Sequence, residues 1–371
     1  MSSSYASNAD EPPLKISKPM SQSPFSSLHK DTAWQVLARV PKRSYPLLAC
    51  VSKNLSYLVR SPEIHKIRSL LRKDSLYISF KNKNDRAQNP SWFTLRRRTE
   101  NTNPREEENQ FVSVHLVLPH HHQLMPSIIA NGPEIFFICV SFILSPSTFW
   151  IFDSRSGELR QGPSMNVNRT YKSVGLVGRK IYVVGGVRSN ESVAESFDLT
   201  TQTWEPAPVP GERMSWLATA TVSLDRKICV LMLAGAYTVC YDTKDGSCES
   251  FDLPKDKWWK AGVCVMDNVL YIYYARFGLM WYDTKLRLWR VVTGLDHLKK
   301  VRSVGMGEYY GKLALLWKER DGFSGEKKEI WCRMIALGRC EEGISGNAES
   351  AQLLGSVPRG YRMDHCLSVS D

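Results

Sequence analysis

The second half of this 371-residue chain repeats one short pattern, an aromatic residue followed directly by an aspartate. The pattern occurs at Phe152-Asp153, Phe197-Asp198, Tyr241-Asp242 and Tyr282-Asp283, with steps of 45, 44 and 41 residues between the aspartates. Six residues after each aspartate stand Leu159, Trp204, Cys248 and Trp289 in turn. A fixed period in this range indicates one structural unit used several times. The repeat therefore predicts a repetitive architecture, and it favours binding over catalysis as the function.

A short hydrophobic run precedes most of these aspartates, and its composition is typical of a β-strand. The runs are 134–139, 180–186, 227–233, 268–274 and, further on, 312–317. Each is entered through a tight turn and is followed by the aromatic-Asp strand and then by a strand near the Trp position. Four antiparallel strands in a unit of roughly 40–50 residues form one blade of a β-propeller. We expect the aromatic residues to pack between blades and the aspartates to cap the turns that follow them.

The two ends of the β-rich region predict how the propeller closes. Residues 362–369 resemble the first strand of a blade with no second strand after them, and 76–80 resemble a second strand with no first. Pairing them would close the ring and remove two exposed sheet edges. We therefore predict six blades, which are 76–118 plus the C-terminal strand, 124–162, 168–208, 213–254, 258–294 and 299–357.

The N-terminal part of the chain lacks this strand pattern. Residues 1–26 are rich in Ser, Pro and Asn, and we expect a disordered tail there. Residues 27–73 predict three short helices: one begins with Asp31 as a candidate N-cap, a second runs from Tyr45 to Leu58, and a third follows Ser61-Pro62. The predicted organisation is thus a tail, a small helical domain, and a propeller over 75–371 that the C-terminal strand closes.

Composition narrows the class of protein. The net charge of +12 is spread along the chain without the dense basic tract of a nucleic-acid-binding protein. The longest apolar run, 135–144, is about half the ~20 residues that a membrane helix needs. The nine cysteines are scattered, and those in apolar runs, such as Cys139, Cys229 and Cys264, are expected to be unpaired small core residues. This pattern fits a soluble protein of a reducing compartment.

No motif predicts catalysis or a cofactor. His120, His121 and His122 are consecutive, so on an extended chain they point alternately to opposite faces and chelate a metal poorly. Neither a nucleophile-elbow serine nor a phosphate-binding loop is present. Gly305-Met306-Gly307 is interpreted as a strand-end turn. We expect no catalytic residue, no metal and no cofactor.

Blade topology predicts where a partner would bind. Loops between strands two and three and loops between blades emerge on one side, and these are the longer, more variable segments. The first strands of the blades begin on that side, and the candidate target-binding residues there are Arg169, Arg213, Trp259, Arg302 and Arg362. Arg and Trp are favoured anchors of protein interfaces. The alternative is that these arginines cap blade edges and bind backbone carbonyls.

Two segments resemble known families. The runs 181–186 and 197–204, followed by Pro206, Pro208 and Arg213-Met214, resemble a kelch repeat, and 162–186 fits the same template. The helical segment 26–71 resembles an F-box. In this order the chain from about residue 27 is similar to plant F-box/kelch-repeat proteins. It departs from the usual F-box opening, Leu-Pro-Asp/Glu-Asp, with Leu28-His29-Lys30-Asp31, and Asn54-Leu55 replaces the Trp usual after Val-Ser-Lys.

The resemblance implies a substrate-recognition subunit of an SCF-type E3 ubiquitin ligase in the cytoplasm or nucleus. Its helices would bind a Skp-type adaptor and, through it, cullin and RING subunits, while the propeller would hold a target protein. The implied adaptor-binding residues are Leu28, Asp31, Leu37, Val40, Leu47, Val51 and Leu58. Asp31 could instead only cap its helix, and some apolar residues could pack on the propeller. The alternatives to a ligase subunit are a ligase-independent interaction scaffold and, third, an enzymatic propeller.

Overall fold

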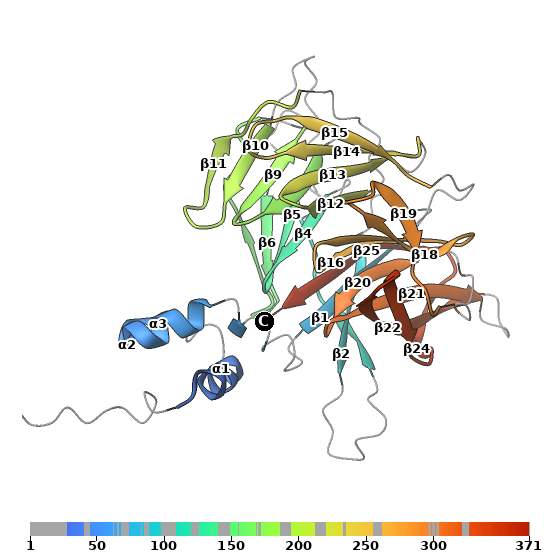
Figure 1. The fold of residues 1–371 in the computed structure, drawn as a ribbon, viewed down its shortest axis with the longest axis horizontal. Coiled ribbons are helices and arrows are strands. Elements are labelled where there is room, and N and C mark those ends of the chain that lie inside the picture. The colour runs from blue at the N-terminus through green and yellow to red at the C-terminus, as the bar shows by residue number, and fades with distance from the viewer. Residues whose placement is uncertain are drawn as a thin grey trace, which may run out of the picture. The chain divides into compact units, whose positions relative to one another are not determined.

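In the computed structural model the chain forms two compact units, Met1–Arg68 and Ser69–Asp371 (Figure 1). The structure describes residues 28–40, 45–61, 63–64, 67, 74–82, 84, 89–97, 109–119, 126–139, 149–154, 156–167, 169, 172–185, 194–211, 220–232, 235–254, 262–295, 298, 301, 304–320 and 326–370.

The first unit is helical, with α1 at Lys30–Arg39, α2 at Tyr45–Val51 and α3 at Lys53–Arg60. His29 takes the N-cap position of α1 without a side-chain cap, so the expectation that Asp31 is the N-cap was wrong. Asp31 lies in the first turn, where a carboxylate interacts favourably with the helix dipole. The predicted second helix is divided at Ser52, whose hydroxyl accepts a hydrogen bond from the Leu55 amide (3.1 Å) and thereby starts α3.

In the described part of the second unit, the strands form six antiparallel sheets, here called blades 1 to 6 (Figure 1). Blade 1 contains β25 (Tyr361–Ser370), β1 (Asp74–Asn82), β2 (Ser91–Arg97) and β3 (Asn109–Val114). Blade 2 contains β4 (Ser127–Asn131), β5 (Glu134–Ile138), β6 (Phe149–Asp153) and β7 (Glu158–Gln161). Blade 3 contains β8 (Ser173–Val177), β9 (Lys180–Val184), β10 (Ala194–Asp198) and β11 (Thr203–Pro206).

The remaining three blades follow in chain order. Blade 4 contains β12 (Ala220–Leu224), β13 (Lys227–Met232), β14 (Tyr237–Asp242) and β15 (Cys248–Asp252). Blade 5 contains β16 (Gly262–Met266), β17 (Val269–Tyr274), β18 (Gly278–Asp283) and β19 (Leu288–Val291). Blade 6 contains β20 (Gly305–Tyr309), β21 (Lys312–Arg320), β22 (Lys327–Cys340) and β23 (Gly343–Ala348), and β24 (Gln352–Pro358) also pairs with β22.

The C-terminal strand completes the first blade, as the sequence predicts. Strand β25 pairs antiparallel with β1, from Asp74 opposite Ser370 to Asn82 opposite Tyr361. The innermost strands β25, β4, β8, β12, β16 and β20 contact one another in this order, and β20 contacts β25 again. The prediction of a six-bladed propeller is thus confirmed, with the two ends of the β-region joined in one sheet.

Glycines on β20 let the last blade approach the first. A Cβ atom at Gly305 would lie 2.2 Å from the Met363 Sδ, and one at Gly307 would lie 2.5 Å from the Leu76 Cδ1. The interpretation of these glycines as a strand-end turn was therefore wrong. They lie within a strand, where the absence of a side chain allows β20 to pack closely on β25 and β1.

The repeated aromatic residues pack as expected. Phe197 lies 5.2 Å from Trp204 between ring centroids, and Tyr282 lies at the same distance from Trp289. The Trp204 indole donates a hydrogen bond to the Pro163 carbonyl, and the Trp289 indole donates to the Asp252 carbonyl, which belongs to the preceding blade. The aromatic repeat therefore joins neighbouring blades.

The repeated aspartates cap the turns that follow them. Asp198 accepts hydrogen bonds from the Thr200 and Thr201 amides (2.7 and 3.3 Å), and Asp283 accepts from Lys285 and Leu286 (both 3.1 Å). These backbone bonds favour the ionised carboxylate and lower the pKa of Asp198 and of Asp283. The sequence-based expectation of an Asp-capped turn is confirmed at these sites.

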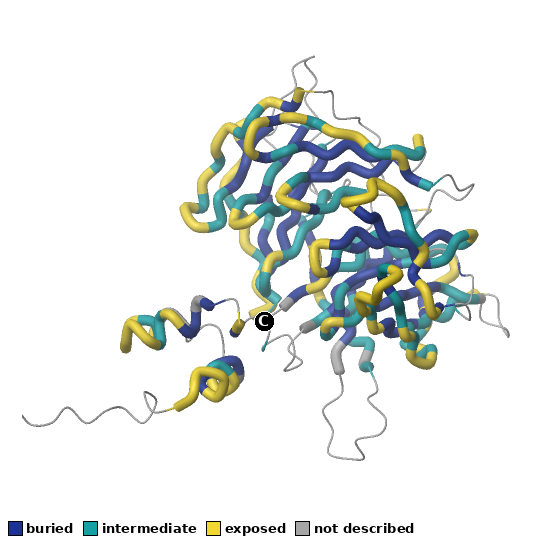
Figure 2. Tube along the Cα trace, viewed as in Figure 1, coloured by how far each residue is buried: buried dark blue, intermediate teal, exposed yellow. Residues whose placement is uncertain are grey.

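Burial follows the propeller topology (Figure 2). The second and third strands of the blades are largely buried, and the turns and outer strands carry most of the exposed residues. Apolar clusters fill the spaces between blades; one between blades 5 and 6 includes Tyr273, Trp317 and Ile335. Among the described residues, none of the helices has the length and apolarity to cross a membrane.

Candidate protein-interaction surfaces and an inter-blade pocket

The helical unit exposes apolar side chains on α2. Leu47 and Val51 are 72% and 73% exposed, and they lie four residues apart, so they share one helix face. Tyr57 on α3 is also exposed, as is Val36 on α1. Large exposed apolar side chains in a small unit mark a surface that a partner can cover.

Two predicted adaptor contacts lie in the interior of that unit instead. Leu37 and Leu58 are each only 2% exposed, because helices this short need their apolar faces to form their own core. An adaptor contact through Leu37 or Leu58 is therefore not supported. Leu28 and Asp31 are exposed, and Val40 is half-buried, so these three remain accessible.

Arg169 is fully buried in the propeller. Its Nε lies 3.1 Å from Glu195 Oε1, and its Nη1 donates to the Gly185 carbonyl at 2.6 Å. Burial lowers the pKa of Arg169, and the Glu195 carboxylate opposes this shift. Glu195 also accepts from the Asn166 amide, so the pair ties the approach to β8 to strand β10. This placement matches the structural alternative for Arg169 and does not support a target contact.

The other predicted target-binding residues are placed only in part. Arg362 on β25 is accessible, and it forms a 3.1 Å ion pair with Asp364. Arg213, Trp259 and Arg302 lie outside the described residues, as do His120, His121 and His122.

Lys172, which the sequence-based reasoning missed, lies three residues after Arg169 at the start of β8. Its Nζ is shielded from solvent and has no hydrogen-bond partner. Burial lowers the pKa of Lys172 to about 8; the charge of Arg169 adds to this shift and Cys139 opposes it. Lys172 lies on the side of the propeller where the inter-blade loops emerge, but its amine is not presented to solvent there.

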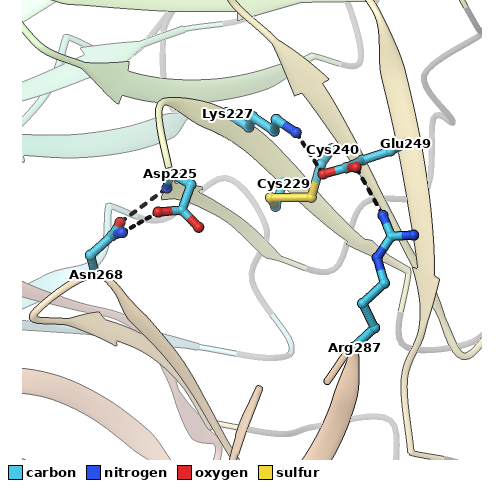
Figure 3. The surroundings of a disulfide bond; sticks show 7 residues. All are labelled: Asp225, Lys227, Cys229, Cys240, Glu249, Asn268 and Arg287. Atoms are coloured by element: carbon cyan, nitrogen blue, oxygen red, sulfur yellow. Dashed lines mark hydrogen bonds and ion pairs between the residues drawn. A yellow bond between two sulfur atoms is a disulfide. The ribbon is translucent and has the colours of Figure 1, made fainter. Parts of the chain in front are cut away.

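A cavity of about 240 Å³ lies between blades 4 and 5. It is bounded by the β12–β13 turn and the β18–β19 turn, which emerge on the side opposite the long loops. Its charged and aromatic lining residues are Asp225, Lys227, Glu249, Phe251, Tyr282 and Arg287. Cys229 and Cys240, which form a disulfide, also line it (Figure 3). The expectation that Cys229 is an unpaired core residue was therefore wrong.

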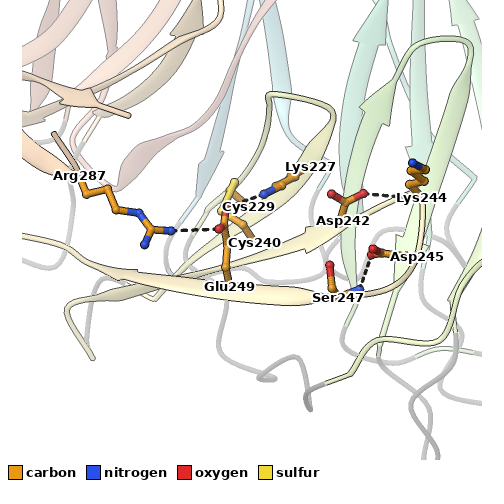
Figure 4. A network of polar contacts seen from close by, with 9 residues as sticks. All are labelled: Lys227, Cys229, Cys240, Asp242, Lys244, Asp245, Ser247, Glu249 and Arg287. Atoms are coloured by element: carbon orange, nitrogen blue, oxygen red, sulfur yellow. Dashed lines mark hydrogen bonds and ion pairs between the residues drawn. A yellow bond between two sulfur atoms is a disulfide. The ribbon is translucent and has the colours of Figure 1, made fainter. Parts of the chain in front are cut away.

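Polar contacts link the two blades around this cavity (Figures 3 and 4). Glu249 forms two ion pairs. The Lys227 Nζ, from the same blade, lies 2.7 Å from Glu249 Oε1, and the Arg287 Nη2, from blade 5, lies 3.2 Å from Glu249 Oε2. The Glu249 carboxylate raises the pKa of Lys227. Asn268 of blade 5 accepts from the Asp225 amide at 3.0 Å and donates to the Asp225 carboxylate.

The Lys227–Glu249 pair has counterparts in other blades. Lys180 pairs with Glu205 at 2.6 Å in blade 3, and Lys312 pairs with Glu349 in blade 6. Each pair joins the first residue of the second strand to an acidic residue in or just after the outer strand. These repeats provide matched controls for blade 4, where the pair lies next to a disulfide.

The described residues contain no cluster of three or more His, Cys, Asp or Glu side chains that could hold a metal ion. The described geometry includes an apolar helical face, a closed ring of blades and the small pocket between blades 4 and 5.

Comparison with known proteins agrees with this organisation. The model of the family described as FKB95, Kelch-repeats domain matches residues 92–354. F-box/kelch-repeat protein At2g44700 of Arabidopsis thaliana is 53% identical over 98% of this chain and 100% of its own length. F-box/kelch-repeat protein At2g44630 of the same plant is 52% identical over the same shares. F-box/kelch-repeat protein At2g22030 is 38% identical over 98% of each chain.

Proposed function

Because this chain belongs to the F-box/kelch-repeat family, we propose that it is the substrate-recognition subunit of an SCF-type E3 ubiquitin ligase. The helical unit binds a Skp-type adaptor, and through it the cullin and RING subunits. The propeller holds a target protein, and the protein acts in the cytoplasm or nucleus. It contributes no catalytic group of its own: ubiquitin transfer is promoted because a bound target has a high effective concentration near the charged carrier enzyme.

The observation that carries the adaptor half of the proposal is the exposed pair Leu47 and Val51. A helical unit with few core residues gains stability when such side chains are covered by a partner. Leu28, Asp31 and Val40 are accessible as well and extend the proposed contact. Leu37 and Leu58 contribute only indirectly, by holding the helices together.

For the target half, the closed ring supports a rigid platform on the side where the inter-blade loops emerge. Arg362 is accessible there. Arg213, Trp259 and Arg302, which lie outside the described residues, remain proposed contacts. A target with acidic groups at its contact surface would complement these residues.

A pull-down of the full-length protein with a Skp-type adaptor tests the adaptor half. Leu47→Asp and Val51→Asp should each abolish capture without changing the melting temperature, because both side chains are already in water. Leu353→Asp, at a 48% exposed position on β24, is the matched control and should bind normally. A folded wild-type protein that captures no adaptor would refute the proposal.

The unusual opening Leu28-His29-Lys30-Asp31 favours one second candidate, a ligase-independent scaffold. That candidate predicts stable capture of a target whose half-life in cells does not change when this protein is removed. The ligase-subunit proposal predicts that the target's half-life lengthens when this protein is removed. Adding back the wild type should shorten it again, whereas adding back Leu47→Asp should not.

A further inference from the structure

Cys229 and Cys240 lie directly opposite each other on β13 and β14, with their Cα atoms 4.0 Å apart. Their side chains point to the same face of blade 4. They pack there with Leu224 and with Leu270 and Tyr282 of blade 5. The disulfide therefore forms part of the seam between blades 4 and 5, and the cavity reaches it (Figure 3).

The backbone pairing of the sheet also holds the two strands of this disulfide together. Strands β13 and β14 are paired without interruption from Lys227 opposite Asp242 to Met232 opposite Tyr237. The disulfide adds a covalent link between residues that the sheet already holds together. When it is reduced, the two sulfur atoms must move apart, and a close-packed core would resist this movement. The adjoining cavity supplies the space, so both redox states can be accommodated.

Other buried cysteines lack these properties. Cys264 and Cys332 are free thiols, and burial raises the pKa of each to about 12. They stay protonated at physiological pH, and a protonated thiol neither attacks a disulfide nor exchanges with one. Among the cysteines of the described residues, Cys229 and Cys240 are the two that form a disulfide.

The chemistry of the cavity walls indicates what could enter. Lys227 and Arg287 present cations, and Asp225 and Glu249 present carboxylates (Figure 4 shows the Glu249 pairs). The Phe251 and Tyr282 rings stack at 4.1 Å and form an apolar wall. Charges of both signs suit a zwitterion. A cavity of about 240 Å³ is smaller than the roughly 300–1,000 Å³ of drug-sized sites, so the ligand must be small.

We propose that Cys229–Cys240 is a thiol–disulfide exchange site, reached through this cavity by a small zwitterionic thiol of the amino-acid or short-peptide type. The ligand thiolate attacks one sulfur of the pair, forms a mixed disulfide and releases the other cysteine as a thiolate, which takes up a proton. A second ligand thiol then cleaves the mixed disulfide. The products are two cysteine thiols and one ligand disulfide, so two electrons pass from two ligand thiols to the protein pair. The reverse sequence restores the bond.

The first test uses the full-length protein in buffers of reduced and oxidised glutathione. Differential alkylation and mass spectrometry report the state of each cysteine. Cys229 and Cys240 should convert together from linked to free as the proportion of reduced glutathione rises, while the circular dichroism spectrum stays native. A pair that remains linked at every ratio in the folded protein, or that is free after exhaustive oxidation, would overturn the proposal.

The second test asks whether the cavity recognises the thiol. Arg287→Gln and Lys227→Gln should slow exchange with reduced glutathione by about 1.4-fold to fivefold, the range that one exposed ion pair supplies. Exchange with 2-mercaptoethanol, which is uncharged, should be unchanged. The matched control is Lys180→Gln, which removes the equivalent pair with Glu205 in blade 3 and should leave both rates unaltered. Equal slowing with both thiols, or no slowing with either, would refute recognition of a zwitterion by the cavity.

Discussion

Two seams of the propeller are built on different physical principles. The seam between blades 6 and 1 is closed by β25 and is closely packed at Gly305 and Gly307, where there is no room for a side chain. The seam between blades 4 and 5 combines apolar packing with the Glu249 and Asp225 contacts, a disulfide and a cavity. The first seam is suited to hold the ring closed. The second can accept a local change, because polar contacts and empty space tolerate small movements better than close packing does.

The largest expected effect is on the closing seam. Deletion of residues 360–371 removes β25 and leaves β1 as an exposed edge, with the apolar side chains of Leu76, Ile78 and Phe80 deprived of their neighbours. We expect an open propeller that accumulates in the insoluble fraction. Expression and sedimentation measure this outcome. A soluble truncation with an unchanged melting temperature would show that β25 does not close the ring.

A single added side chain should also damage the closing seam. Gly307→Val would force a side chain against Leu76 and Cys366, and overpacking of this kind costs about 1–3 kcal/mol of unfolding free energy. Gly338→Val is the matched control, because nothing lies within 4 Å of a Cβ atom at that β22 position. Denaturant unfolding compares the two. Equal losses in both variants would mean that close packing at the seam is not the cause.

The disulfide should contribute less than the packing of the closing seam. The double variant Cys229→Ser/Cys240→Ser removes a cross-link between residues separated by 11 positions, for which loop-closure entropy gives at most about 3 kcal/mol. Ordered neighbours and the adjoining cavity should reduce this figure, so we expect a decrease of only a few degrees in melting temperature. Reducing agent should lower the wild-type melting temperature by the same amount and leave the variant unchanged. Complete unfolding of the variant would place the disulfide among the essential parts of the fold.

The two seams should also differ, by the smallest amount, in their response to pH. Burial lowers the pKa of His365 on β25, Arg362 and Lys81 add to this effect, and Asp364 opposes it. His365 therefore takes up a proton more readily in the unfolded chain than in the folded one. As a result, the free energy of unfolding decreases as pH falls through 6.5, the ordinary pKa of histidine. At the other seam, the raised pKa of Lys227 places its titration far above this range.

His365→Gln measures the size of that acid response. The variant should lose part of the decrease in stability between pH 7.5 and 5.5 that the wild type shows in denaturant unfolding. Glu249→Gln, at the other seam, should leave the slope over this interval unchanged. An identical slope in the wild type and in His365→Gln would exclude His365 as its source.

The sequence predicted the fold closely because each blade of the propeller is encoded by a local, repeated sequence pattern. The spacing of the aromatic-Asp pairs predicted the blade repeat. The unmatched strands near Leu76 and Arg362 predicted that the C-terminal strand closes the ring. One signal for the disulfide was also present: Cys229 and Cys240 each lie three residues from the facing strand ends, Met232 and Tyr237. An antiparallel hairpin places residues at equal distances from its centre opposite each other.

The candidate sites were less predictable, and the physical reason is burial. The helical spacing treated Leu37, Leu58, Leu47 and Val51 alike, as apolar residues of one surface. It did not indicate that Leu37 and Leu58 are buried while Leu47 and Val51 are exposed. Arg169 lies in the segment before β8, and its burial depends on Glu195 of β10 and on Gly185, which directly follows β9.

By itself, then, the sequence determined the number of blades, their order and the way the ring closes, since these follow from strand periodicity and from the need to pair every edge. Only the tertiary structure decided which arginine is buried, which helix face stays in water, and that a cavity adjoins the Cys229–Cys240 bond. These properties arise where segments distant in the chain meet, and no local pattern encodes the volume left between them.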